Sequence, residues 1–406
     1  MVTVRPFRGL RYAAPQEAGL YAPPYDVIDA ELRQTLLARS AHNIVHLDLG
    51  PMPPDEGWYA QAADTLRAWL AGGVLRRDEA PAFYGYCQAF TWAKRRYVRS
   101  GFFGRVKLEP WGRGIHRHEL TRNQPKADRL RLMRALNMQT SPVFGLFEDP
   151  AGAVAAILTG PPGPGADLVE VADDNGVEHR LWAIRDPDEV ASLQTALAQS
   201  EVVIADGHHR YETALALSAE RHATGGPSDA DDVFMSLVPR NDSGLLVLPT
   251  HRVVRASPLQ GEALLTALRQ RFSVTPTDLP LAQAIAGQAQ TLGLRLQGAS
   301  YVLRPLRSRL DREELAVTLL QERLLEPVLG ITPAQVAASD LIVYTIDADE
   351  ACAMVDVGEA ALAVILNPTP LDAVWRAALQ DQVMPQKSTF FYPKLLTGLV
   401  MNPLWA

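Results

Sequence analysis

Residues 202–212 read Val-Val-Ile-Ala-Asp-Gly-His-His-Arg-Tyr-Glu, and the rest of the chain is organised around them. Three β-branched residues followed by alanine predict a short buried strand, and Gly207 allows the backbone to turn after it. The next dozen residues predict a helix, because Tyr211, Ala214 and Leu215 fall on one face at helical spacing. The stretch therefore predicts a strand, a glycine turn and a helix.

The predicted turn gathers a carboxylate, two imidazoles and a guanidinium, supplied by Asp206, His208, His209 and Arg210. The first N–H groups of a helix point outward and favour anions, and Gly207 has no side chain to obstruct a ligand. Imidazoles and a bidentate guanidinium can donate to phosphate oxygens, and Asp206 suits a hydrated Mg²⁺. A metal site built by protein alone is disfavoured, because adjacent histidines point in different directions. We interpret the turn as a nucleotide phosphate site; the alternative is that the histidines merely cap the turn.

The composition is that of an ordinary globular protein, with 406 residues, 47% hydrophobic and 21% charged. This length predicts two or more lobes. A formal charge of −7 argues against a nucleic-acid partner, and two cysteines are too few for a disulfide framework. The first ten residues lack the apolar core of a signal peptide, and no stretch reaches the roughly 18 apolar residues of a membrane span. We therefore expect a cytoplasmic protein with no membrane partner.

We expect an α/β (α+β) fold made of three regions. These are an N-terminal α/β region at 1–105, a catalytic core at 106–255 with an insertion near 150–200, and a C-terminal α/β region at 256–406. Inside the insertion, Asp173-Asp174-Asn175-Gly176 predicts a hairpin turn, and Asp186 followed by proline predicts a helix start. The stretch 257–330 is predicted to be mostly helical, with strands at 292–296 and 301–305.

Three further segments carry residues suited to chemistry. Glu119, preceded by His118, is a candidate general base, although such a charged run also suits a solvated helix face. Lys387-Ser388-Thr389 offers an ammonium and two hydroxyls for phosphate or carboxylate capture, and the alternative is an ordinary surface loop. Near the N-terminus, residues 23–28 read Pro-Pro-Tyr-Asp-Val-Ile, where Asp26 could cap a helix over 31–39 or belong to a structural turn.

These segments together resemble the domain-of-unknown-function 1015 family of bacteria and archaea. The resemblance rests on residues 23–28, 118–121, 205–212 and 384–394, in this order, and covers nearly the whole chain. By itself this resemblance assigns no activity. A more distant one does: Asp-Gly-His-His-Arg after a strand is similar to the signature of the ParB/sulfiredoxin superfamily, and most of all to its free-serine kinases. Those kinases also carry a His-Glu before the signature and a Pro-Lys-Thr-Thr segment near the C-terminus.

This second resemblance implies a ParB/sulfiredoxin-like catalytic lobe and a role for each matching residue. Glu119, beside His118, would deprotonate a serine hydroxyl, and Asp206 would be the second catalytic carboxylate and a Mg²⁺ ligand. The residues implied to hold nucleotide phosphates are Gly207, His208, His209 and Arg210. Those implied to contact the phosphoryl group or the substrate are Lys387, Ser388 and Thr389. Further possible site residues are Asp26, Glu212, His251 and Arg252.

The chain also departs from the kinase pattern. Glu119 and Asp206 are 87 positions apart, much further than in the compact kinases, and Gln386 replaces the proline before the lysine. The sulfiredoxin reaction is disfavoured because His208 stands where that enzyme needs a cysteine. The function we expect is phosphorylation of a small hydroxyl compound, first of all L-serine, by ATP or ADP with Mg²⁺. The alternatives are a ParB-like nucleotide switch and a phosphatase that uses the same phosphate cradle.

Overall fold

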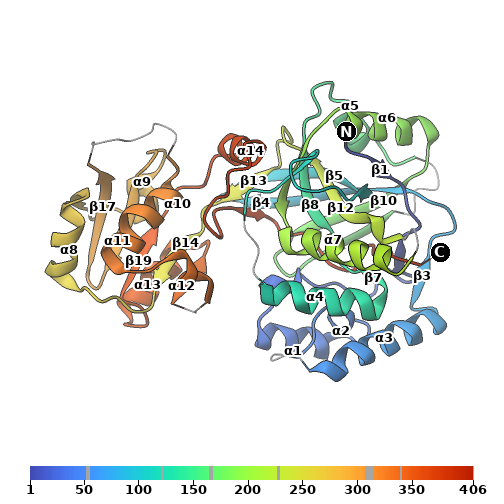
Figure 1. Cartoon of the computed structure of the whole chain (residues 1–406), viewed down its shortest axis with the longest axis horizontal. Coiled ribbons are helices and arrows are strands. Elements are labelled where there is room, and N and C mark those ends of the chain that lie inside the picture. Colours follow the sequence, from blue (N-terminus) through green and yellow to red (C-terminus); the bar gives the residue numbers. More distant parts are fainter. Residues whose placement is uncertain are drawn as a thin grey trace. The chain divides into compact units, whose positions relative to one another are not determined.

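The computed structural model describes residues 1–51, 55–119, 123–163, 168–225, 229–306, 314–338 and 341–405. The chain divides into two units, which are drawn together in Figure 1. Unit 1 comprises residues 1–117, 121–245 and 393–406, and unit 2 comprises residues 118–120 and 246–392. Both units are mixtures of helices and strands, so the expected α/β class is confirmed.

Unit 1 is built on a mixed sheet, nine-stranded over the described residues, with the order β6-β11-β8-β12-β5-β4-β10-β9 and with β1 paired to β5. Its strands are β1 (Val4–Arg5), β4 (Phe83–Trp92), β5 (Arg95–Lys107), β6 (Ile115–His116), β8 (Val143–Phe147), β9 (Val169–Ala172), β10 (Glu178–Ile184), β11 (Val202–Asp206) and β12 (Asp232–Pro239). Two small ladders join β2 (Leu10–Tyr12) to β3 (Leu75–Arg77) and β7 (Met138–Gln139) to β21 (Asn402–Pro403). Strands β8, β11 and β12 are apolar runs buried along nearly their whole length, as expected for strands covered on both faces.

Helices cover both faces of this sheet. The helices of unit 1, over the described residues, are η1 (Tyr25–Val27), α1 (Ala30–Arg39), α2 (Val45–Asp48), α3 (Glu56–Ala71), α4 (Asn123–Leu136), α5 (Ala153–Thr159), α6 (Pro187–Ala198), α7 (His208–Ala223) and η2 (Asp229–Asp231). Figure 1 shows α5 and α6 on one side of the sheet and α7 on the other, with α4 between α7 and the α1–α3 group. Leu132 and Leu136 of α4 pack into a core with Trp58, Leu66 and Trp69 of α3.

Unit 2 holds an antiparallel sheet, six-stranded over the described residues, with the order β15-β17-β16-β19-β14-β18. Its strands are β14 (His251–Val254), β15 (Phe272–Pro276), β16 (Leu292–Leu296), β17 (Ala299–Pro305), β18 (Ile342–Thr345) and β19 (Leu362–Ile365), and β13 (Leu246–Leu248) pairs separately with β20 (Phe390–Tyr392). Its helices are α8 (Gly261–Arg269), α9 (Leu281–Ile285), α10 (Ala316–Leu320), the π-helical turn η3 (Gln321–Leu325), α11 (Glu326–Leu329), α12 (Pro333–Ala338), α13 (Ala348–Asp356) and α14 (Leu371–Leu379).

The sheet of unit 2 separates two hydrophobic cores. Leu362 and Val364 of β19 join the core under α8 and α10, whereas Ala363 and Ile365 join the core under α9 and α13. Successive side chains of a strand point to opposite faces, so four consecutive apolar residues supply both cores.

The division of the chain differs from the three expected regions. The expected boundary at 105/106 falls inside β5, and β14, expected in the catalytic core, belongs to the sheet of unit 2. The expected insertion near 150–200 is part of the main sheet, because β10 pairs along its whole length with β4. Local sequence patterns indicate where strands lie but not which strands pair. The pairing determines how the chain divides into units.

Several local predictions are confirmed and others are wrong. The hairpin of β9 and β10 forms, and the Asp186 side chain caps α6 by accepting two backbone N–H groups. The cap of α1 is Asp29, which accepts from the Leu32 N–H, and not Asp26. The stretch 257–330 is less helical than predicted, because Phe272–Pro276 forms the strand β15. Its Val and Thr residues favour a strand, but the ladder with β17 decides the matter.

Candidate active site

The turn between β11 and α7 is confirmed as predicted. The ladder between β11 and β8 shifts register between Ile204 and Asp206, so a bulge re-aims the end of the strand. Gly207 follows with φ +90°, a left-handed conformation that favours glycine, and α7 begins at His208. The carboxylate of Asp206 therefore lies directly beside a helix N-terminus.

Gly207 is also required by the closeness of Arg210. A Cβ atom added at residue 207 would lie 2.8 Å from Arg210 Nε. The Arg210 guanidinium donates from Nη1 to the Pro142 carbonyl oxygen, and its Nη2 lies 3.4 Å from Asp206 Oδ2. The Arg210 side chain thus stabilises the turn by its contacts with Pro142 and Asp206, whereas the sequence predicted that it would clamp two phosphate oxygens. The clamp stays a prediction.

A second cation approaches Asp206 from a distant part of the chain. Lys394 Nζ lies 3.3 Å from Asp206 Oδ2, the same oxygen that faces Arg210. Both separations exceed the 2.7–2.9 Å or so that is usual for a charge-assisted N–H···O bond. One carboxylate shared by two cations leaves the cluster with more positive than negative charge, beside the positive end of a helix dipole.

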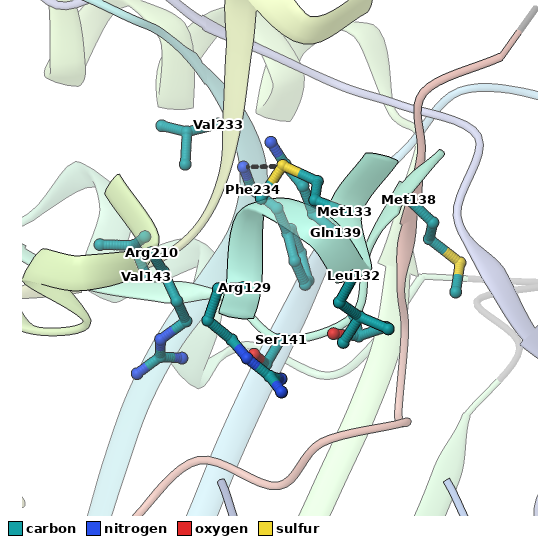
Figure 2. Close-up of a pocket in the computed structure, with 11 residues that line it drawn as sticks. Arg129, Leu132, Met133, Met138, Gln139, Ser141, Val143, Arg210, Val233 and Phe234 are labelled. Atoms are coloured by element: carbon teal, nitrogen blue, oxygen red, sulfur yellow. Dashed lines mark hydrogen bonds between the residues drawn. The ribbon is translucent and has the colours of Figure 1, made fainter. Parts of the chain in front are cut away.

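A small cavity lies beside Arg210 (Figure 2), lined by Arg129, Leu132, Met133, Met138, Gln139, Thr140, Ser141, Val143, Arg210, Val233 and Phe234. Its volume of about 30 Å³ matches the volume of roughly one water molecule, so it holds no nucleotide. The Arg129 guanidinium lies 4.2 Å from the centre of the Tyr25 ring and donates to the Asp48 carbonyl oxygen. Burial raises the pKa of Tyr25 to about 12, against the opposing charges of Arg129 and Arg210. Tyr25 therefore brings the N-terminal Pro-Pro-Tyr-Asp motif against the guanidinium of Arg129, which lines this cavity, whereas Asp26 is exposed.

The other predicted residues of the turn lie at different depths. His208 is buried, and His209 is half-buried, with its carbonyl oxygen accepting from Thr213 Oγ1 at 2.7 Å. Glu212 forms an ion pair with Lys126 Nζ at 2.9 Å and lies 4.0 Å from Arg117. Phosphate contact by either histidine and a site role for Glu212 stay predictions.

Unit 2 brings Glu119 to the predicted Lys387-Ser388-Thr389 loop. Glu119 forms a β-bridge with Met384, whose N–H donates to the His118 carbonyl oxygen at 2.8 Å. The buried His118 ring shares a hydrogen bond of 3.2 Å between its Nε2 and Thr389 Oγ1. Two motifs about 270 residues apart in sequence therefore form one cluster, as the sequence resemblance implied, whereas the Asp206 turn belongs to unit 1.

Arg252 holds the backbone of this loop. Its buried guanidinium donates to the carbonyl oxygens of Gln386 at 3.1 Å and Lys387 at 3.0 Å, and also to that of Thr250. Lys387 has φ +56°, a left-handed conformation that strains a side chain with a Cβ, and its side chain is exposed. Burial lowers the pKa of Arg252 to about 10, although Tyr344 and Glu119 oppose the shift. Arg252 therefore stabilises a strained backbone that presents the Lys387 ammonium.

His251 and Ser388 make contacts that a structural role explains. The His251 Nδ1 atom accepts from the Leu366 N–H at 3.1 Å, and burial lowers the pKa of His251 to about 4. The ring is therefore neutral at pH 7 and carries its proton on Nε2. Ser388 is buried, with its hydroxyl donating to the Pro385 carbonyl oxygen and its own carbonyl accepting from Thr369 at 2.7 Å.

The described residues fit a nucleotide-borne Mg²⁺ and not a metal caged by protein. Among them, no group of three or more His, Cys, Asp or Glu side chains is placed to hold a metal ion. Mg²⁺ commonly takes one or two carboxylates and fills its shell with phosphates and water, and Asp206 would be that carboxylate. Within the same part of the chain, every helix is too short or too polar to span a bilayer.

Sequence reasoning missed Lys394, which contacts Asp206, and the two residues that bond to the backbone of its segment, Gln88 and Arg99. Lys394 lies inside a motif that was recognised but received no role. Gln88 and Arg99 lie on β4 and β5, where they form a directly opposed cross-strand pair. No local signal marks them, since a single polar residue in an alternating strand normally faces solvent.

Comparisons with known proteins place the chain in a family. None of the curated proteins matches it significantly. Similar solved structures include a conserved hypothetical protein from Pyrococcus furiosus, with 13% identity, TM-score 0.38, and 74% of this chain and 95% of that chain covered. They also include a free serine kinase in complex with AMP, with 12% identity, TM-score 0.37, and 74% and 92% coverage. A variant of a free serine kinase in complex with ADP shows 11% identity, TM-score 0.39 and the same coverage. These TM-scores mark a distant likeness only. Residues 4–327 match the family described as "Protein of unknown function (DUF1015)", and this chain belongs to that family.

Proposed function

We propose that this chain is a nucleotide-dependent phosphotransferase that acts on a small hydroxyl compound, with L-serine as the first acceptor to test. ATP or ADP would be the phosphoryl donor, and the lobe around α7 would be ParB/sulfiredoxin-like, as the motif resemblance implies. The observation that carries the proposal is the cationic cluster at the N-terminus of α7. The proposal includes no nucleic-acid or membrane partner.

The donor would bind at the β11–α7 turn of unit 1. Asp206 faces both Lys394 and Arg210, so positive charge is in excess there. The helix dipole of α7 adds to this charge. Phosphate groups carry the complementary charge and accept hydrogen bonds from ammonium and guanidinium groups.

Glu119, Lys387 and Thr389, all in unit 2, would act on the acceptor. A carboxylate for a base and an ammonium for charge neutralisation are what phosphoryl transfer to a hydroxyl requires. Glu119 is half-buried, and the backbone of the exposed Lys387 is held by Arg252. The His118–Thr389 hydrogen bond ties the two segments together beside the base.

In the proposed reaction, the acceptor oxygen forms a bond to the terminal phosphorus of the nucleotide. The bond between that phosphorus and the bridging oxygen breaks, and the shortened nucleotide leaves with the electron pair. The acceptor proton passes to the Glu119 carboxylate and from there to water. Lys394 and the N–H groups at the start of α7 offset the charge of the phosphates, and Asp206 would hold the nucleotide's Mg²⁺. When bound, Mg²⁺ supplies further neutralisation of phosphate charge.

A nucleotide switch and a phosphatase would use the same phosphate cradle. Both would consume nucleotide or phosphoester without making a new phosphoester. Glu119 favours the transferase over a nucleotide switch, because a switch needs no base. Incubating the protein with ATP or ADP, Mg²⁺ and a panel of hydroxy amino acids, and measuring phosphoserine, separates the three activities.

The decisive variant is Glu119→Gln, with Glu262→Gln on the exposed face of α8 as the control for losing one carboxylate. Removing a positioned base lowers proton-transfer catalysis by about 10²–10⁴-fold. We expect that loss in phosphoserine formation for Glu119→Gln, with nucleotide affinity unchanged, and no loss for Glu262→Gln. Full transferase activity in Glu119→Gln would show that the base is another residue.

A further inference from the structure

Lys394 reaches the Asp206 turn from a segment 188 residues away in sequence. We propose that Lys394 is a phosphate-binding residue of this site, and that Gln88 and Arg99 are positioning residues that set its backbone. This inference rests on the nucleotide site of the proposed function and adds the residue that would contact the phosphate. The main phosphate-binding cation would then be Lys394 and not Arg210, which the sequence had indicated.

The first support is that Arg210 and Lys394 make different contacts. Arg210 donates to the Pro142 carbonyl oxygen and lies under Gly207, so its guanidinium helps to form the turn itself. Lys394 meets Asp206 at 3.3 Å with its side chain 17% exposed. Lysine presents a compact charge with three rotatable donors on a flexible stem. The ammonium can therefore turn to a phosphate oxygen while it remains close to the carboxylate.

The second support is the way in which the backbone at Lys394 is held. Arg99 Nη2 donates to the Pro393 carbonyl oxygen at 2.6 Å, and Gln88 Nε2 donates to the Lys394 carbonyl oxygen at 2.9 Å. The two side chains also bond to each other, from Arg99 Nη2 to Gln88 Oε1. Two consecutive carbonyls are thus fixed by two opposed residues of the central sheet, so the Lys394 side chain leaves the backbone from a defined point.

The third support is that this clamp is deeply buried. Arg99 is 2% exposed and Gln88 is 1% exposed, and the guanidinium lies 4.9 Å from the centre of the Phe144 ring. Burial lowers the pKa of Arg99 to about 10, so the group is still charged at pH 7. A buried charge is unfavourable unless it is well bonded. Among the bonds it makes are those that fix Pro393 and, through Gln88, Lys394.

Binding of inorganic pyrophosphate and of ADP, measured by isothermal titration calorimetry on the full chain, tests the phosphate role. Loss of one hydrogen bond to a charged group weakens binding by about 10- to 100-fold. We expect that loss for Lys394→Met. The control is Lys107→Met, which removes the same charge from an exposed lysine of unit 1 and should leave affinity unchanged. Unchanged affinity in Lys394→Met, or an equal loss in the control, would overturn the assignment.

The positioning role is tested with Gln88→Met alone and together with Lys394→Met. If Gln88 acts through Lys394, Gln88→Met weakens pyrophosphate binding in the wild-type background and adds no further loss in the Lys394→Met background. A purely structural Gln88 would lower the melting temperature and give the same affinity change in both backgrounds, which would refute the role. Gln88→Asn, which keeps an amide, replaces Gln88→Met if that variant does not fold.

The outcome of these measurements is independent of the outcome for the proposed kinase activity. If the wild type binds pyrophosphate through Lys394 but makes no phosphoserine, the inference stands and the transferase proposal falls. If the wild type binds neither pyrophosphate nor ADP, the inference itself is refuted.

Discussion

Replacing Gly207 by alanine tests the β11–α7 turn most directly. The residue has φ +90°, and its new Cβ would lie 2.8 Å from Arg210 Nε, so the variant suffers two separate penalties. Gly176 in the β9–β10 hairpin supplies the matched control, because it has φ +71° and nothing within 4 Å of an added Cβ. Comparing Gly207→Ala with Gly176→Ala therefore isolates the contact with Arg210.

The expected size of each penalty follows from these contacts. A left-handed conformation costs an alanine about 1–2 kcal/mol, and the stiffer unfolded chain returns about 0.4–1 kcal/mol, in both variants. Only Gly207→Ala displaces the Arg210 guanidinium from Pro142 and Asp206. Hydrogen bonds of a charged group contribute about 1.5–3 kcal/mol. We therefore expect Gly207→Ala to lower the free energy of unfolding by about 1.5–3 kcal/mol more than Gly176→Ala.

Urea unfolding followed by tryptophan fluorescence measures this difference. Six of the seven tryptophans belong to unit 1, and the Trp111 ring lies 4.5 Å from the ring of Tyr211 on α7. We also expect ADP affinity to fall for Gly207→Ala and to stay unchanged for Gly176→Ala. Equal losses of stability in the two variants, or undiminished ADP binding in Gly207→Ala, would refute the account of the turn.

Two further predictions concern unit 2. His251, with its pKa lowered by burial to about 4 against about 6.5 when unfolded, binds a proton less readily in the folded state. The free energy of unfolding therefore keeps its full value above about pH 6.5 and falls as the pH drops toward 4, by about 2 kcal/mol at pH 5. His251→Asn, which keeps an acceptor for the backbone N–H, should remove this acid sensitivity in urea midpoints measured from pH 7 to pH 5, whereas His222→Asn should keep it. A lysine presents all its donors from one nitrogen, so Arg252→Lys cannot reproduce the fork in which Nη1 bonds to the Thr250 carbonyl and Nη2 bonds to those of Gln386 and Lys387. We therefore expect the Lys387 loop to loosen and the KM for the acceptor to rise about tenfold. Arg255→Lys, at the exposed position directly after β14, is the control, and a rise in KM equal to that of Arg252→Lys would contradict the assignment.

The local elements were predictable from the sequence where neighbouring residues decide them. The apolar run before Asp206, the glycine after it and the helical spacing from Tyr211 onward are all short-range signals, and the structure confirms each of them. The same holds for the cap by Asp186 and for the hairpin around Asn175. The wrong prediction of the α1 cap is also a short-range error, because Asp29, three residues from the expected Asp26, supplies that cap.

Tertiary structure decided which residues meet at the Asp206 turn and which meet around Glu119. Lys394 meets Asp206 across 188 residues, Arg99 meets Pro393 across 294, and His118 meets Thr389 across 271. Each contact depends on which strands pair and on how a returning chain crosses them. Strand propensity and charge pattern describe a residue and its neighbours, and they carry no information on distant pairing. The sequence therefore determined where the chemically useful side chains lie along the chain, and packing decided which of them act together.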